Sequence, residues 1–566
     1  MTHDAWNGAC TSARRHLAEP VEYSFTDCER AALGPFFSNL DRKVFFIDRM
    51  SPAVGSALMA MYSRLKNPRG LRGHFVDRLL PSMLAQFLSE CGGMDGRTIQ
   101  KWLKQRDIVR LDDFVGYSAS ATGLYCAFRD AMQGGVMWKS MAVGERIKQF
   151  LSMWLDAYGH NSIARTAQLM FGIEGISILA AKSLEWTRPG AGFIELSTRY
   201  VDFSGKAIYP VHEELDRYDE VAAASANAHV QRAIDRYRRL IGEGFDGPFP
   251  SFLRDRWSGV VPEADLKSGI IGESCDVLGN LLPCATLTQV GVSISGESLP
   301  ELLKHLYLDD LPETVALAET IAGEAEHAGA GHFIRHLERS EWRQAGWSYL
   351  EPTPVPVISS SVLPREWTQG VLGQLFRETE LFRGLSFDEV IAQLTALERG
   401  AHDKLPNQFE HVSSGFGYVM SFRGWRDLQR QGYCTHHRSL VTAREGFYAY
   451  PKPRPDALPR AFAEAETEDR AIEAVLHRAD VPARLRQYAM AMGQLVTYRI
   501  GANLLQWEFC NWQRTKWGVN DEVRQQFLRF EGELRAMYPW WQRISRADMT
   551  PHYVFARGNT PVMLSE

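Results

Sequence analysis

The segment Glu195–Tyr200, which reads Glu-Leu-Ser-Thr-Arg-Tyr, carries a carboxylate, a hydroxyl and a guanidinium group at alternate positions. If the segment is extended, the side chains of Glu195, Ser197 and Arg199 point to one side, because successive side chains of a strand alternate. They then offer an acceptor, a short donor and a bidentate clamp. This set suits a phosphorylated ligand that also carries hydroxyl groups or a base edge. The alternative is an ordinary strand edge with a surface arginine.

The sequence before this segment contains Gly159-His160-Asn161-Ser162 and, later, Phe171-Gly172-Ile173-Glu174-Gly175-Ile176-Ser177. In this order the segments resemble the core of the flavin-dependent thymidylate synthases. In that family an Arg-His-Arg triplet, then seven residues and a serine, marks the flavin and nucleotide site. Only Arg188 remains of the triplet here. The resemblance therefore implies an eroded flavin site and a retained nucleotide site: cofactor contacts from His160 and Arg188, and substrate contacts from Glu195, Ser197, Arg199 and Tyr200.

The second half of the chain keeps other parts of the same pattern. Phe409-Glu410-His411 matches a Phe-Glu-His motif of the family, and Arg430, which follows Gln429, stands where its triplet begins. Arg514 corresponds to the arginine that reaches the nucleotide of a neighbouring subunit. The resemblance implies substrate contacts from Gln429, Arg430 and Arg514, and cofactor contacts from Glu410, His411 and Arg430. The first half thus retains the clamp residues Ser197 and Arg199, and the second half retains Arg514. This distribution predicts one composite site formed by residues of both halves.

The order of elements indicates a diverged tandem repeat. A Pro- and Ser-rich stretch at 351–366 is typical of a linker. On each side of it an apolar run, a Tyr-Pro, a charged helix and a Gln-(Val/Leu)-x5-Gly segment recur in the same order. We expect an N-terminal domain with a helical extension at 1–350, the linker at 351–366, and a second domain of the same kind at 367–566.

Hydrophobic periodicity favours an α+β fold. Alternating apolar residues predict a strand over 286–294, and apolar spacing predicts helices over 299–306 and 315–326. Charged helices are expected over 213–242 and 457–479. With the resemblance, this predicts two tandem synthase-like domains, each a mixed or antiparallel sheet with flanking helices, that form a pseudo-dimer. A homodimer of the fused pair would then be a pseudo-tetramer.

Composition excludes several classes of function. The 566 residues carry a net charge of −5, so no general basic field recruits nucleic acid or a membrane surface. No apolar run is long enough to span a membrane, and the N-terminus lacks the pattern of a signal peptide. The eight cysteines form no Cys-x-x-Cys pair, which fits a reducing cytoplasm. His436-His437 lacks a third ligand at helical spacing, so no metal site is expected.

The resemblance implies transfer of a one-carbon unit from methylene-tetrahydrofolate to C5 of dUMP or a related pyrimidine nucleotide, with FAD as hydride carrier and NADPH as reductant. No protein nucleophile is expected, because the flavin carries the difficult chemistry. Two alternatives stay open. One is a repurposed member that binds a nucleotide-like phosphorylated ligand with different or flavin-free chemistry. The other is a non-catalytic scaffold subunit.

Overall fold

The structure is a computed structural model that describes residues 11–47, 65–80, 111–118, 120–126, 164–165, 167–186, 190–309, 311–328, 330–334, 360–400, 402–551, 553–555 and 562–563, with single residues 98, 101, 105 and 337. The chain forms two compact units, each built from discontinuous segments. Unit 1 comprises residues 1–197 and 287–347, and unit 2 comprises residues 198–286 and 348–566. The sequence predicts one boundary between the two domains, at the linker 351–366. The two compact units are divided differently, because residues 198–286 are grouped in unit 2 with the C-terminal part of the chain.

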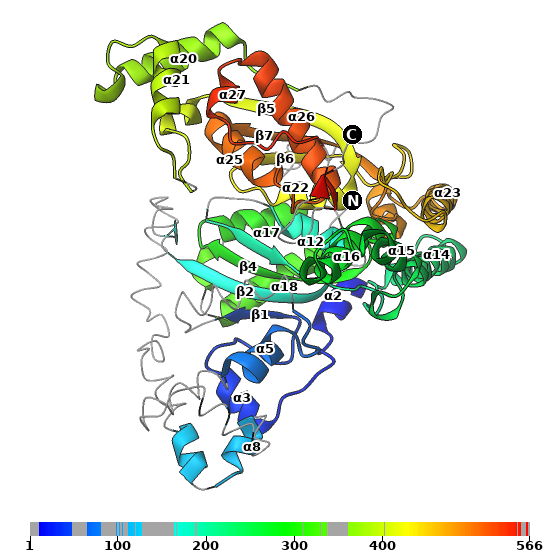
Figure 1. The fold of residues 1–566 in the computed structure, drawn as a ribbon. Coiled ribbons are helices and arrows are strands. Elements are labelled where there is room, and N and C mark those ends of the chain that lie inside the picture. Colours follow the sequence, from blue (N-terminus) through cyan, green and yellow to red (C-terminus); the bar gives the residue numbers. More distant parts are fainter. Residues whose placement is uncertain are drawn as a thin grey trace. The chain divides into compact units, whose positions relative to one another are not determined.

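Unit 1 contains a four-stranded antiparallel sheet with the order β1-β2-β4-β3 (Figure 1). Its strands are β1 (Val44–Ile47), β2 (Gln168–Ser177), β3 (Gly192–Glu195) and β4 (Leu287–Ser295). Helix α18 (Pro312–His327) contacts β1, and α17 (Ser298–Leu308) contacts β4. The other described helical segments of this unit are α2 (Thr11–Ala18), α3 (Asp27–Leu33), α5 (Gly70–His74), η2 (Phe75–Leu79), α8 (Leu111–Val115), α12 (Ile178–Leu184) and η6 (Gly331–Phe333).

Unit 2 contains a three-stranded antiparallel sheet with the order β5-β7-β6. Its strands are β5 (Ser413–Ser421), β6 (Thr435–Arg438) and β7 (Leu495–Asn503). Helix α22 (Phe422–Gln429) contacts β5, β7 and α26 (Asp521–Met537), and α25 (Leu504–Arg514) contacts β7 and α26 (Figure 1). Two helices of equal length, α14 (Glu220–Ile241) and α23 (Ala457–Arg478), pack against each other.

The remaining described elements of unit 2 are shorter or peripheral to the sheet. They are α13 (Val211–Leu215), η4 (Glu243–Phe245), α15 (Pro248–Trp257), α16 (Glu263–Leu278), η5 (Gly279–Leu281), α20 (Arg365–Arg377), η7 (Glu380–Phe382), α21 (Phe387–Ala396), η8 (Asn407–His411), α24 (Ala483–Arg486), η9 (Gln487–Ala489), α27 (Trp541–Ile544), β8 (Tyr553–Phe555) and β9 (Val562–Met563). No helix in the described part of the chain is both long and apolar enough to cross a membrane.

Alternating burial fixes the inner face of each sheet. In β4 the side chains of Val290, Val292 and Ile294 are completely buried, and in β7 the same alternation buries Val496, Tyr498 and Ile500. Because side chains of a strand alternate between faces, each run places one apolar face against the core. The α+β class and the strand predicted over 286–294 are therefore confirmed, as are the helices predicted over 299–306, 315–326 and 457–479.

Two local predictions were wrong. The charged helix expected over 213–242 is divided, because Asp219 accepts a hydrogen bond from the backbone N–H of Ala222 at 2.7 Å and starts α14 anew. The extended conformation expected through Tyr200 ends with β3 at Glu195, and residues 198–200 form a turn. The side chains of Ser197 and Arg199 therefore do not continue the alternation that starts at Glu195.

In both units, a serine between a strand and the following helix binds a glutamate of a later helix, so that the pair connects all three elements. In unit 2, Ser421 ends β5 and caps α22, and its Oγ and backbone N–H both donate to Glu522, at 2.5 and 2.7 Å. In unit 1, Ser177 ends β2 and caps α12, and its Oγ and N–H donate to Glu313 at 2.6 and 2.8 Å. Both glutamates lie in the first turn of a helix, where a carboxylate is favoured.

We expect Ser421→Ala to lower the free energy of unfolding of unit 2 by about 1–3 kcal/mol, because it removes a helix cap and a hydrogen bond to the half-buried carboxylate of Glu522. Urea denaturation measures the loss. Ser413→Ala, at an exposed position of the same strand, is the control and should change stability by no more than about 0.5 kcal/mol. A Ser421→Ala variant as stable as this control would contradict the role of the junction.

Candidate functional site

Helix α22 carries the first functional side chains. It starts at the Ser421 junction, where the Gly424 N–H donates to Ser421 Oγ at 2.9 Å. A Cβ at Gly424 would lie 2.5 Å from Glu522 Oε2, so only glycine fits here without a shift. At the other end, Gln429 is the last helical residue and Arg430 is the C-cap. The junction at Ser421 therefore determines where α22 ends, and with it the position of the Gln429 amide group and the Arg430 guanidinium group.

Asp427 binds Arg430 on the same helix. Arg430 Nη2 donates to Asp427 Oδ1 at 2.5 Å, a pairing of residues i and i+3. The Asp427 residue is only 8% exposed. A buried carboxylate requires a cationic partner, because removing a charge from water is costly unless it is paired. Arg430 keeps nearly a third of its side chain exposed, so its guanidinium group is both anchored and accessible.

A second pair of arginines converges on Asp276 of α16. Arg423 Nη2 donates to Asp276 Oδ1 at 2.8 Å, and Arg199 Nε lies 3.5 Å from the same oxygen. Arg199 Nη2 also donates to the backbone carbonyl oxygen of Gly518 at 3.0 Å. A Cβ at Gly279 would lie 2.6 Å from Arg423 Nε, so this glycine makes room for the buried guanidinium group. Arg199 is thus held in place by two separate segments of unit 2.

Arg514, the last residue of α25, completes the group. Burial alone would raise the pKa of Asp427, but the guanidinium groups of Arg430, Arg199, Arg423 and Arg514 hold it well below its usual range. Burial lowers the pKa of Arg514; Asp427 opposes this shift, and Arg430 and Arg199 add to it. We call these six side chains the arginine cluster: Arg199, Arg423, Arg430, Arg514, Asp276 and Asp427.

The arginine cluster has the chemistry of an anion site. Its four guanidinium groups and two carboxylates leave two net positive charges. Guanidinium groups match the oxygen geometry of phosphate and carboxylate groups, and they remain charged at any physiological pH. Gln429, buried next to Arg430 at the end of α22, adds an amide group that both donates and accepts. The cluster can therefore bind a phosphorylated ligand that carries a polar ring edge.

The structure brings three of the predicted substrate residues together: Arg199, Arg430 and Arg514 all act on Asp427. Tyr200 is 38% exposed, and its ring centroid lies 5.8 Å from the Arg199 guanidinium carbon. Ser197 is half-buried just before the turn. Glu195 has a different environment in unit 1. There it is buried and forms an ion pair with Lys182, whose Nζ lies 2.8 Å from Glu195 Oε2. Lys182 also forms an ion pair with Glu185.

The predicted cofactor residues are not gathered in this way. Glu410 and His411 are exposed on the 3₁₀ turn η8, where Phe409 is buried. His160 and Arg188 lie outside the described residues. Arg430 is the one predicted cofactor residue that the structure places in the arginine cluster.

Sequence reasoning missed Asp276, Arg423 and Asp427. Two of them had a signal, since Arg423, Asp427 and Arg430 recur at spacings of four and three residues and thus share one face of a helix. Asp276 had none. It comes from α16, far away in the sequence, and only the tertiary fold brings it to Arg199 and Arg423.

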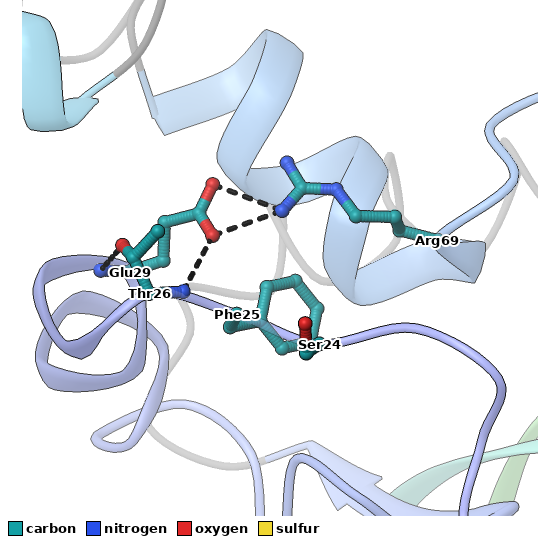
Figure 2. A pocket seen from close by; sticks show the side chains of 5 residues that line it. All are labelled: Ser24, Phe25, Thr26, Glu29 and Arg69. Atoms are coloured by element: carbon teal, nitrogen blue, oxygen red, sulfur yellow. Dashed lines mark hydrogen bonds and ion pairs between the residues drawn. The ribbon is translucent and has the colours of Figure 1, made fainter.

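One pocket of unit 1, about 460 Å³ in volume, contains none of these arginines (Figure 2). It is lined by Ser24, Phe25, Thr26, Glu29 and Arg69. Arg69 Nη1 binds both carboxylate oxygens of Glu29 at 3.0 and 2.9 Å, and Glu29 also closes a capping box with Thr26 at the start of α3. These groups satisfy one another and support the local fold of the segment.

No group of three or more His, Cys, Asp or Glu side chains among the described residues is placed to hold a metal ion. His436 lies on β6, where burial lowers the pKa of its imidazole to about 4, against a weaker raising effect of the Gln431 carbonyl. Its Nε2 lies 3.5 Å from that oxygen. His436 is therefore a neutral packing residue of the sheet.

This pKa predicts a pH dependence of stability. The unfolded histidine takes up a proton near its ordinary pKa of about 6.5, before the folded one does. The unfolded state therefore binds more protons than the folded state between about pH 6.5 and pH 4. Lowering the pH across this window reduces the free energy of unfolding by about 2–3 kcal/mol. We expect His436→Gln to flatten the pH profile of the denaturation midpoint. The variant His437→Gln, at the exposed neighbour, should keep the wild-type slope; equal slopes in all three proteins would refute the assignment.

Comparison with known proteins gives a family match for part of the chain. Residues 119–327 match the model of a family described as thymidylate synthase complementing protein. A UPF0159 protein of Chlamydia pneumoniae is 24% identical over 528 residues, which cover 86% of this chain and 88% of that protein. A UPF0159 protein of Thermoplasma acidophilum is 22% identical over 447 residues, covering 70% and 87%. Among solved structures, the UMP/dUMP methylase PolB from Streptomyces cacaoi bound with 5-Br dUMP matches with a TM-score of 0.27 and 14% identity, covering 34% of this chain and 94% of that chain.

Proposed function

We propose that this chain methylates C5 of dUMP or a related pyrimidine nucleotide, because residues 119–327 match the thymidylate synthase complementing protein family, which is the family of flavin-dependent thymidylate synthases. The one-carbon donor is methylene-tetrahydrofolate. The observation that carries this proposal is the arginine cluster, an assembled anion site whose members Arg199, Arg430 and Arg514 act on a single carboxylate.

In this proposal the nucleotide phosphate lies against Arg199, Arg430 and Arg514. Gln429 hydrogen-bonds the edge of the uracil ring, and Tyr200, partly exposed beside Arg199, borders the site. The substrate contact expected from the Ser197 hydroxyl stays a prediction. These residues bind and orient the base, and orientation itself supplies much of the rate enhancement when two reactants must meet. The arginines also lower the cost of bringing a dianion out of water.

The flavin contacts that the resemblance implies are part of the proposal too, although the structure places only Arg430 of them in the arginine cluster. Arg430 offers a guanidinium group to a phosphate, and the exposed Glu410 and His411 offer an acceptor and a donor for polar ring atoms. His160 and Arg188 are proposed to add further contacts. When bound, FAD would supply hydride transfer and NADPH would regenerate its reduced form. The protein residues hold the rings and exclude water.

We also propose that the chain is a tandem duplication that forms a pseudo-dimer. Both β2 and β5 end in a serine that pairs with the first residue of the next long strand, Leu287 or Leu495. Both serines bind a glutamate in the first turn of a later helix. Helices of the same length, α14 and α23, follow the two short strands β3 and β6. The repeats correspond to the sequence domains 1–350 and 367–566, separated by 351–366.

The register of the sheets identifies the equivalent positions of the two repeats. Glu195 pairs with Val290, and Arg438 pairs with Tyr498 at the same place in the other sheet. Counting onward along the sequence, Arg199 corresponds to Thr442. Counting from the ends of β4 and β7, Arg514 corresponds to Leu306. The second potential site thus lacks both arginines, so we propose one working site per chain. We further propose that two chains associate as a pseudo-tetramer.

If Arg199 and Arg514 bind one ligand, their effects should be strongly non-additive. We expect Arg199→Ala alone to weaken dUMP binding by about 2–5 kcal/mol, and the double variant with Arg514→Ala to lose clearly less than the sum of both single losses. Calorimetric titration with dUMP measures this. The matched controls are Thr442→Ser and Leu306→Met at the equivalent positions, which should bind dUMP like the wild type. Additive losses, or wild-type affinity of Arg199→Ala, would contradict a shared site.

The activity itself is tested by colour and by complementation. Purified protein with flavin absorbance near 450 nm is expected from the proposal, together with rescue of a thymidine auxotroph. A colourless protein that still binds dUMP would point to a repurposed, flavin-free member of the family. A protein that binds neither ligand would refute an enzymatic role and favour a scaffold subunit.

A further inference from the structure

The arginine cluster contains a carboxylate where an anion site would be expected to exclude one. Asp427 lies on the same helical face as Arg423 and Arg430, and one of its oxygens, Oδ1, binds Arg430 at 2.5 Å. The other oxygen, Oδ2, is buried and accepts no hydrogen bond from the described residues. A buried carboxylate oxygen of this kind costs free energy unless surrounding positive charge compensates it. Four guanidinium groups supply that compensation here.

We propose that Asp427 is a charge-setting residue, whose carboxylate reduces the positive charge of the cluster so that it matches a phosphate monoester and discriminates against more highly charged anions. This inference rests on the proposed nucleotide site. With Asp276, Asp427 leaves two net positive charges on the cluster. A phosphate monoester carries close to two negative charges at pH 7. A diphosphate carries about one more, which the Asp427 carboxylate would repel.

The geometry separates this role from that of a simple structural ion pair. Asp276 already holds Arg423 and Arg199 through one oxygen, at 2.8 and 3.5 Å, so it anchors the buried side of the cluster. Asp427 instead binds Arg430, whose side chain is 31% exposed. Any anion that reaches Arg430 therefore meets the Asp427 carboxylate on the same guanidinium group. The carboxylate contributes repulsion that grows with the charge of the ligand.

The test compares anions of different charge on the full-length chain. Dissociation constants are measured by calorimetry, at one ionic strength, for inorganic phosphate and pyrophosphate and for UMP and UDP. We expect Asp427→Asn to raise the preference for pyrophosphate over phosphate by about tenfold, because one opposing charge is removed from a partly screened site. Glu468→Gln, on α23 outside the cluster, changes the net charge of the protein equally and should leave the preference at the wild-type value.

Each outcome decides between charge setting and structure. If Asp427→Asn weakens all four ligands by the same factor, or leaves the preference unchanged, Asp427 is only a structural partner of Arg430 and the inference is overturned. If Asp427→Asn does not fold, Asp427→Ser removes the same charge with a smaller side chain and must shift the preference in the same direction. The two proposals are separable. A shift seen with inorganic anions, but with UMP bound no better than phosphate, supports charge setting and refutes the nucleotide site. Tight UMP binding without any shift in the preference supports the nucleotide site and refutes charge setting.

Discussion

The hydrogen bonds between Ser421 and Glu522 fix the start of α22 against α26, and the arginine cluster depends on where this helix ends. Helix α22 has eight residues, a length of about 12 Å, and a helix this short has little stability of its own. Its direction comes from the serine that caps it and from the glutamate that binds the serine on both N–H and Oγ. Gln429 and Arg430 lie at the far end, so a small tilt at Ser421 would displace both of them.

The arginine cluster shows how like charges can be kept close together before any ligand arrives. Burial lowers the pKa of Arg423 and of Arg514, because the charged guanidinium group is less stable out of water. Asp276 and Asp427 offset this cost, and Gly279 leaves the space that Arg423 needs. The guanidinium groups are therefore ordered by the fold itself. An anionic ligand does not have to organise them, which lowers the entropic cost of binding.

What the sequence predicted depends on how local each signal is. The strand β4 and the helices α17, α18 and α23 follow from apolar spacing within one segment, and the structure contains all of them. The proximity of Arg199 and Arg514 was expected from order and resemblance, and both arginines act on Asp427. The turn after Glu195 and the break before α14 were not predicted, because side-chain capping and tertiary contacts decide them. Asp276 could not be predicted, since its partners come from other segments of the chain.

The end of α12 in unit 1 has a consequence for how this protein can change over generations. Lys182 is completely buried and lies between the carboxylates of Glu185 and Glu195. A substitution of Lys182 alone would leave two buried negative charges without their shared counterion, and such losses cost about 3–5 kcal/mol. Replacement of Glu195 alone would instead leave Lys182 and Glu185 as a neutral buried pair. The lysine, which is the counterion of both glutamates, is therefore the position of this trio where a single substitution is tolerated least.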